Sequence, residues 1–93
     1  MLELKQSARF KKDLKRELRK PDRDSIMKSL TLVTDLLQKR MVLPDKYQVH
    51  RLKGKYVGYF ECHVRPDLLL IYVVVDESVL ELVRLGSHSE LFK

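Results

Sequence analysis

The sequence lacks tryptophan and contains one cysteine, three prolines and three glycines among its 93 residues. Because Cys62 has no partner within the chain, an internal disulfide is excluded. Long hydrophobic runs are also missing: the longest, residues 68–75, has the length of a strand and falls far short of the roughly 20 residues that cross a bilayer. No repeat, linker or low-complexity segment interrupts the pattern, so we expect one domain spanning residues 1–93.

The first ten residues, MLELKQSARF, include no apolar signal region. We therefore expect that the protein is not exported, that it has no membrane partner and that it resides in the cytoplasm. Hydrophobic residues make up 44% of the chain and charged residues 34%, proportions that favour a folded globular domain over a disordered one.

Acidic residues are in the minority, with 13 Asp and Glu against 19 Lys and Arg, which gives a net charge of +6. A basic domain of this size favours a polyanionic partner, either nucleic acid or an acidic protein, although charge alone fits a solubilising surface equally well. The excess is concentrated between Lys5 and Lys20, where the acids are Asp13 and Glu17.

The first half of the sequence predicts a strand followed by two helices. Alternation at residues 2–4 indicates a short strand, and Ser7 is a suitable N-cap for a helix that Pro21 ends. Asp22 or Asp24 can then cap a second helix, and the short connection predicts a helical hairpin. The apolar stripes of the two helices are Phe10, Leu14 and Leu18, and Ile26, Leu30, Val33 and Leu37. The basic face of the first helix consists of Lys11, Lys12, Lys15, Arg16 and Arg19.

The second half predicts strands. Residues 41–54 contain Pro44 and Gly54 without a sustained period, which indicates a loop. Alternating or continuous apolar patterns predict strands at residues 56–63, 68–75 and 79–85, joined by turns at 64–66 and 76–78. The expected fold class is therefore α+β, with an N-terminal strand and a helical hairpin packed on an antiparallel sheet in β-α-α-β-β-β order.

Three histidines, His50, His63 and His88, lie in this less helical half. A hairpin brings His63 near Asp67, and a carboxylate beside an imidazole fixes the orientation of the ring. Arg84 lies within reach if the last strand pairs with the central one. The same residues also fit an ordinary surface, because loop histidines are commonly exposed, Asp67 suits a turn and Arg84 can extend away from a sheet. Spacing alone leaves both interpretations open.

A family resemblance favours the catalytic interpretation. The matching elements are His50 followed by Leu52 and Gly54, the run His63-Val64-Arg65-Pro66-Asp67, the strand end Leu70-Ile71-Tyr72, and Arg84-Leu85-Gly86-Ser87-His88 before Leu91-Phe92. Together these elements, within residues 43–92, resemble the YafQ branch of the RelE/ParE toxins, which belong to type II toxin–antitoxin systems. The first half matches only in pattern, as a basic helical hairpin. The resemblance implies a RelE-like fold, ribosome-dependent cleavage of messenger RNA, and neutralisation by a cognate antitoxin, through which the complex binds operator DNA.

The resemblance also implies which residues act. The matching positions are His50, His63, Asp67, Arg84 and His88 for catalysis, and Phe92, which either stacks on a nucleobase or closes the sheet as a hydrophobic plug. Two positions depart from the family pattern. Arg65 stands where an acidic residue is common, and we expect it to contribute to substrate binding. Leu68 replaces a tryptophan, and leucine does not stack on a base as an indole does. The basic helix face is expected to contact ribosomal RNA or the antitoxin.

These residue types suit RNA cleavage, because RNA supplies its own nucleophile, the 2′-hydroxyl. Histidine can accept and donate protons near neutral pH, and arginine can bind two phosphate oxygens of the transition state. We expect His88 to be the general acid, with His50, His63 and Asp67 supplying and orienting the base. This chemistry requires no cofactor.

Three other interpretations are open. A non-catalytic ParE-like toxin that poisons DNA gyrase shares the fold but has no need for the His, Asp and Arg set. A purely structural RNA-binding module fits the charge. A metal-binding module of three histidines and Asp67 fits poorly, because zinc sites usually contain closely spaced ligand pairs and none occurs here, so we expect no metal.

Overall fold

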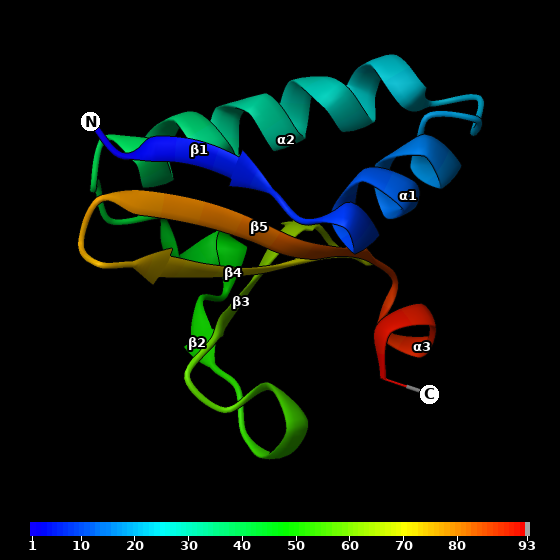
Figure 1. Cartoon of the computed structure of the whole chain (residues 1–93). Coiled ribbons are helices and arrows are strands. Elements are labelled where there is room, and N and C mark those ends of the chain that lie inside the picture. Colours follow the sequence, from blue (N-terminus) through cyan, green and yellow to red (C-terminus); the bar gives the residue numbers. More distant parts are fainter. Residues whose placement is uncertain (93) are drawn as a thin grey trace.

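The computed structural model describes residues 1–92, in which two long helices cover one face of a five-stranded sheet (Figure 1). The helices are α1 (Ala8–Glu17), α2 (Arg23–Gln38) and α3 (His88–Leu91), with 3₁₀ turns η1 (Asp45–Tyr47) and η2 (Gly54–Tyr56). The strands are β1 (Glu3–Gln6), β2 (His50–Arg51), β3 (Phe60–Arg65), β4 (Leu68–Val75) and β5 (Val79–Gly86). Within these residues, no helix has both the length and the apolar character needed to span a membrane.

The strand order is β1-β5-β4-β3-β2, and the predicted α+β class is confirmed. Strands β3, β4 and β5 form the predicted antiparallel meander. The sheet is mixed, however, because β1 pairs with β5 in parallel. The chain passes through both long helices between these two strands, and a crossover of this kind permits parallel pairing.

The predicted Ser7 cap is confirmed, whereas Asp22 stands at the N-cap position of α2 without a side-chain cap hydrogen bond. The Ser7 side chain caps α1 by accepting the Phe10 N–H at 3.0 Å, and its hydroxyl donates to the Val83 carbonyl at 2.8 Å. The cap therefore also fixes the start of α1 against β5. Apolar residues of both helices pack on one sheet face in a core that includes Phe10, Ile26, Leu30, Val33, Leu70, Leu80, Leu82 and Leu85.

The predicted boundaries between residues 41 and 66 are partly wrong. The expected loop contains η1 and the two-residue strand β2. Strand β3 begins at Phe60 rather than at residue 56, because residues 54–56 form a 3₁₀ turn and Gly58 has φ +92°, outside the strand region. It also continues to Arg65, with a bulge between His63 and Arg65 where a turn was predicted.

The final segment contains a helix that the pattern of apolar residues does not predict. Ser87 and Glu90 form a capping box: the Glu90 N–H donates to the Ser87 side chain, and the Ser87 N–H donates to the Glu90 carboxylate at 2.8 Å. This S-x-x-E spacing is a helix-start signal that was available in the sequence. Helix α3 lies beyond the end of β5, away from α2 (Figure 1).

The outer edge of β5 is covered by two different elements. Strand β1 pairs with β5 only as far as Gln6 opposite Leu82. Farther along, the Leu85 N–H donates to Asp13 at 3.0 Å, and the Leu85 carbonyl accepts from Arg16 at 2.8 Å. Buried backbone N–H and C=O groups need hydrogen-bond partners. Here side chains of α1 supply the partners that a longer β1 would otherwise provide.

Candidate active site

Three of the expected catalytic residues share the sheet face opposite the long helices. Strand register aligns His50, Glu61, Ile71 and Arg84 in one row across β2, β3, β4 and β5. The next row contains His63, Leu69 and Gly86. Residues directly opposite each other in an antiparallel pair project to the same face. Ile71 and Leu69 belong to a second apolar cluster on this face, which gives the polar residues a buried floor.

A buried carboxylate lies between the first two histidines. Glu61 is 4% exposed, and its Oε1 lies 3.0 Å from Nε2 of His50 and 3.9 Å from Nε2 of His63. The other ring nitrogen of His50, Nδ1, lies 3.0 Å from the Gln48 carbonyl, so both ring nitrogens of His50 have partners. The carboxylate beside His63 is therefore Glu61 rather than the predicted Asp67.

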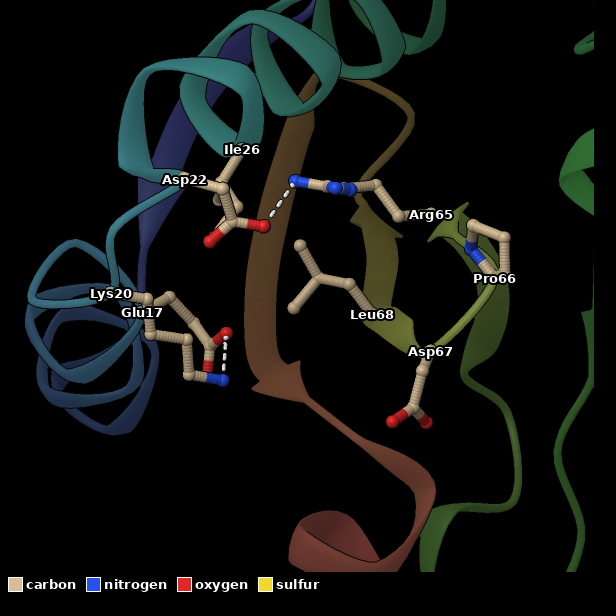
Figure 2. Close-up of a pocket in the computed structure, with 8 residues that line it drawn as sticks. All are labelled: Glu17, Lys20, Asp22, Ile26, Arg65, Pro66, Asp67 and Leu68. Carbon is tan, nitrogen blue, oxygen red and sulfur yellow. Dashed lines mark hydrogen bonds and ion pairs between the residues drawn. The ribbon is translucent and has the colours of Figure 1, made fainter.

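The turn between β3 and β4 separates Asp67 and Arg65 (Figure 2). Arg65 lies on the helix side, where its Nη1 is 3.0 Å from the Asp22 carboxylate at the start of α2. Asp67 is exposed and points away from this ion pair, at the rim of a pocket of about 210 Å³. The position of Arg65 does not support the expected contact with substrate, because its charge is paired and faces α2. The bulge in β3 is the reason. It shifts the register so that Arg65 pairs with Leu68, and Leu68 faces the main core beneath the helices.

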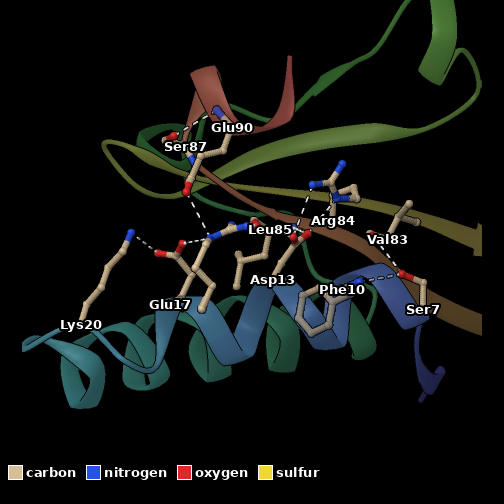
Figure 3. Close-up of polar contacts among 11 residues, drawn as sticks. Ser7, Phe10, Asp13, Glu17, Lys20, Val83, Arg84, Leu85, Ser87 and Glu90 are labelled. Carbon is tan, nitrogen blue, oxygen red and sulfur yellow. Dashed lines mark hydrogen bonds and ion pairs between the residues drawn. The ribbon is translucent and has the colours of Figure 1, made fainter. Parts of the chain in front are cut away.

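Arg84 is buried, at 8% exposure, and is held by an acid that the sequence did not single out. Its Nε donates to Asp13 at 2.8 Å and its Nη2 donates to the same carboxylate at 3.3 Å (Figure 3). The hydrogen bond with Asp13 is the main reason that the pKa of Arg84 is raised, and Tyr56 contributes. Burial would raise the pKa of Asp13, but hydrogen bonds from Arg84 and Leu85 and the charges of Arg84 and Arg16 lower it. Both groups are therefore charged at neutral pH.

His88 and Phe92 occupy the two ends of α3. Their ring centroids are 5.0 Å apart, and the Phe92 ring lies edge-on to Tyr56 at 6.1 Å. Gly86 pairs with Leu69 at one end of the β4–β5 pair. His88 comes two residues after Gly86 and Asp67 comes two residues before Leu69, so His88 and Asp67 lie beyond that same end. Within residues 1–92 no hydrogen bond or ion pair joins His88 to His50 or His63.

The expected basic face divides into two parts. Lys11, Lys12 and Lys15 are exposed on α1, and Arg19 is exposed just beyond its end. Arg16 is half-buried and contacts the carboxylates of Asp13, Glu17 and Glu90. Arg16 therefore does not belong to the exposed basic surface, because acids on α1 and α3 already neutralise its charge.

Sequence patterns contained signals for the residues that were missed. Glu61 lies two positions before His63, so alternation along a strand places both on one face. Asp13 and Glu17 follow Phe10 at helical spacing and are therefore acids on a core-facing stripe. A charged residue at such a position requires a partner, although the sequence does not identify it.

Known proteins resemble the chain over nearly its full length. The mRNA interferase toxin YafQ of Escherichia coli (strain K12) is 34% identical over 90 residues, which cover 97% of this chain and 95% of the relative. The crystal structure of a metal-bound toxin from Helicobacter pylori is 43% identical, with a TM-score of 0.88 and coverage of 99% of this chain and 100% of that one. A chain in the crystal structure of the E. coli DinJ–YafQ toxin–antitoxin complex is 33% identical, with a TM-score of 0.84 and coverage of 99% and 98%.

The metal bound by the Helicobacter pylori toxin raises the question of a metal centre here. Among residues 1–92, His, Cys, Asp and Glu side chains form no group of three or more that is able to hold an ion. The buried thiol of Cys62 is a poor ligand, because burial, followed by the charge of Glu61, raises its pKa to about 12.

The family assignment agrees with the fold. The family described as the bacterial toxin of type II toxin–antitoxin system, YafQ, matches residues 2–93. The chain therefore belongs to the YafQ family of toxins from bacterial type II toxin–antitoxin systems.

Proposed function

We propose that this chain is an endoribonuclease that cuts messenger RNA on the ribosome, in the cytoplasm, and thereby stops translation. The observation that carries the proposal is the pair of imidazoles 3.0 and 3.9 Å from one oxygen of buried Glu61, in the same sheet face as Arg84. Family membership supports it, since the E. coli relative is named an mRNA interferase toxin.

The proposed reaction is an internal transfer at phosphorus. The 2′-oxygen of the RNA forms a bond to the adjacent phosphorus while the bond from phosphorus to the 5′-oxygen breaks. A base on the toxin takes the 2′-hydroxyl proton, and an acid on the toxin gives a proton to the departing 5′-oxygen. The products are a 2′,3′-cyclic phosphate and a free 5′-hydroxyl. Each well-placed acid or base contributes about 10²–10⁴ in rate.

Glu61 supports an assignment of the base to the histidine pair. A buried carboxylate 3.0 Å from Nε2 of His50 holds that ring, whose Nδ1 faces the Gln48 carbonyl, so His50 serves to orient the site and His63 is the candidate that accepts the proton. His63, 3.9 Å from the same oxygen, is part-buried and shares this charge. Asp67 lies at the rim, where it can orient the RNA or His88 but does not contact His63 in the way expected from the sequence.

His88 and Arg84 complete the proposed site. His88 is exposed on α3 and is the candidate acid for the 5′-oxygen. Arg84 uses Nε and Nη2 to bind Asp13, so other donors of its five N–H groups remain for phosphate oxygens. The Phe92 ring lies beside His88 and edge-on to Tyr56, and stacking of one base on such a ring contributes about 1–3 kcal/mol.

The proposed partners follow from charge and from the relatives. The exposed cations on and just after α1 are proposed to contact the ribosomal RNA backbone; they are Lys11, Lys12, Lys15 and Arg19. A cognate antitoxin is proposed to neutralise the toxin, as the E. coli relative forms a complex with DinJ. We propose that operator DNA is bound only through the antitoxin in that complex.

End mapping on translating ribosomes tests the proposal. The wild-type protein is expected to produce new 5′ ends within the message, and His88→Ala to reduce their appearance by about 10²–10⁴ while ribosome binding persists. Ser89→Ala is the matched control, because Ser89 is the exposed neighbour of His88. Ribosome binding by the wild type without any cleavage would favour the RNA-binding interpretation and contradict the proposal.

A further inference from the structure

Helix α3 is too short to maintain its own conformation. It comprises four residues, whereas isolated helices shorter than about 12–15 residues are marginal in water. Yet it begins with His88 and is followed by Phe92, both members of the proposed site. The direction in which the His88 ring points therefore depends on contacts between α3 and the rest of the protein.

Two of these contacts lie within the second half of the chain. The capping box between Ser87 and Glu90 shapes the first turn. Leu91 is buried in the apolar cluster with Leu69 and Ile71, which fixes one side of the helix to β4. Neither contact determines how the opposite side of α3 lies relative to α1.

A third contact crosses from α1 and is made by Arg16. Its Nε lies 3.1 Å from Oε2 of Glu90, and its Nη2 donates to the Leu85 carbonyl at 2.8 Å. Its Nη1 lies 3.2 Å from Asp13, and its Nε lies 3.1 Å from buried Glu17. One guanidinium thus joins two acids of α1 to both the end of β5 and the side of α3.

The charges around Arg16 are balanced, so its position is well defined. The acids that face it are Asp13, Glu17 and Glu90. Two further cations share these acids: Arg84 binds Asp13, and Lys20 lies 2.8 Å from Glu17. Because Asp13 also holds Arg84, the same network connects the candidate phosphate-binding residue to the helix that carries the candidate acid.

We propose that Arg16 is a positioning residue, whose guanidinium holds α3 against α1 so that His88 is directed to the scissile linkage. The inference rests on the proposed RNA-cleaving function and adds to it a residue on α1 that does not contact the RNA. It assigns Arg16 a different role from the exposed lysines beside it. Removing its guanidinium leaves His88 in place in the sequence but frees the helix that orients it.

Gly86 offers an independent way to disturb this contact. A Cβ at position 86 would lie 2.7 Å from Nη2 of Arg16 and 3.1 Å from Oε1 of Glu90. Gly86 does not adopt a left-handed conformation, so alanine is tolerated by the backbone there. The nearest atom is the far end of a flexible side chain, and Cδ2 of Leu91 would lie 3.3 Å away, so Gly86→Ala crowds the junction of Arg16, Glu90 and Leu91 without replacing Arg16 itself.

The test compares Arg16→Met and Gly86→Ala with Arg23→Met, a control in which an exposed arginine of α2 is replaced. Single-turnover cleavage of ribosome-bound message is measured over a range of toxin concentrations, together with amide hydrogen exchange. In both test variants the maximal rate is expected to fall about tenfold or more, while the half-saturating concentration changes less than about threefold. The Leu91 and Phe92 amides, which donate to Ser87 and His88, are expected to exchange faster, with β4 unchanged. Arg16→Lys is expected to restore part of the rate.

The outcomes separate this inference from the function on which it rests. Wild-type protein that leaves the message uncut overturns the proposed function. Wild-type cleavage with an undiminished rate in Arg16→Met overturns the positioning role alone. A slower Arg16→Met with unchanged exchange in α3 also overturns it, because the residue would then act by another route.

Discussion

Replacement of Asp13 is expected to destabilise the fold far more than loss of an ordinary helix surface acid. Asp13 is 5% exposed and accepts hydrogen bonds from Nε and Nη2 of Arg84 and from the Leu85 N–H. In Asp13→Ala, the buried guanidinium of Arg84 loses its carboxylate and the Leu85 N–H loses its acceptor. Breaking a buried ion pair by removing one partner costs about 3–5 kcal/mol.

The assay is urea denaturation followed by circular dichroism, with thermal melting as a second measure. For a domain of this size, a loss of about 3 kcal/mol lowers Tm by roughly 12–24 °C. Asp13→Asn keeps an acceptor for the Leu85 N–H and is expected to lose less stability than alanine. Asp35→Ala is the matched control, since Asp35 also pairs with a cation on a helix but is half-exposed. Such surface pairs contribute about 0–1 kcal/mol. An Asp13→Ala variant as stable as Asp35→Ala would refute the reasoning.

Four further predictions concern the acid network, the histidine face, the exposed cations and the core thiol. The pKa of Asp13 is lowered as described above, and that of Glu90 is lowered chiefly by the hydrogen bond from the Ser87 N–H. A carboxyl group whose pKa is lower in the folded state than in the unfolded state stabilises the fold at pH values above the unfolded pKa, which is about 4. The free energy of unfolding, measured by urea denaturation, is therefore expected to fall as the pH drops below about 4. A urea midpoint that rises in acid would contradict this. Glu61→Gln is expected to slow single-turnover cleavage about 10- to 100-fold, because it replaces a charge-assisted contact to the histidines; an unchanged rate would exclude its role. Reversal of Lys11, Lys12 and Lys15 to Glu is expected to weaken ribosome binding and flatten its dependence on salt, whereas parallel salt curves would remove α1 from that interface. Cys62, fully buried with its pKa raised to about 12, is expected to react with a thiol reagent only after unfolding, and rapid labelling of the native protein would show that the core is open.

Local chemistry was sufficient to predict much of the fold. The Ser7 cap, the break at Pro21 and the apolar spacing of the helices depend on neighbours a few residues apart, so the sequence records them directly. The meander was predicted for the same reason. Parallel pairing of β1 with β5 depends on how the whole helical hairpin crosses the sheet, which the pattern of residues 2–4 does not contain.

The site was predictable as a set of residue types but not as a set of contacts. Histidine and arginine positions were identified through the family resemblance, and register then places His50, His63 and Arg84 on one face. The bulge in β3 turns Arg65 toward α2, and a bulge of this kind leaves no clear signal in the sequence. The partners of Arg16 on β5 and α3, and the partner of Arg84 on α1, lie about 70 residues away in sequence, so only the folded chain identifies them.

The central claim is that the sheet face carrying His50, His63 and Arg84 promotes attack by the 2′-hydroxyl of the message. The most direct measurement is single-turnover cleavage, on the ribosome, of a message in which the nucleotide before the scissile bond carries 2′-deoxyribose. The account predicts that the toxin binds this complex normally and leaves that linkage intact, while the all-ribose message is cut to a 2′,3′-cyclic phosphate. Cleavage of the deoxy linkage at the wild-type rate would contradict it.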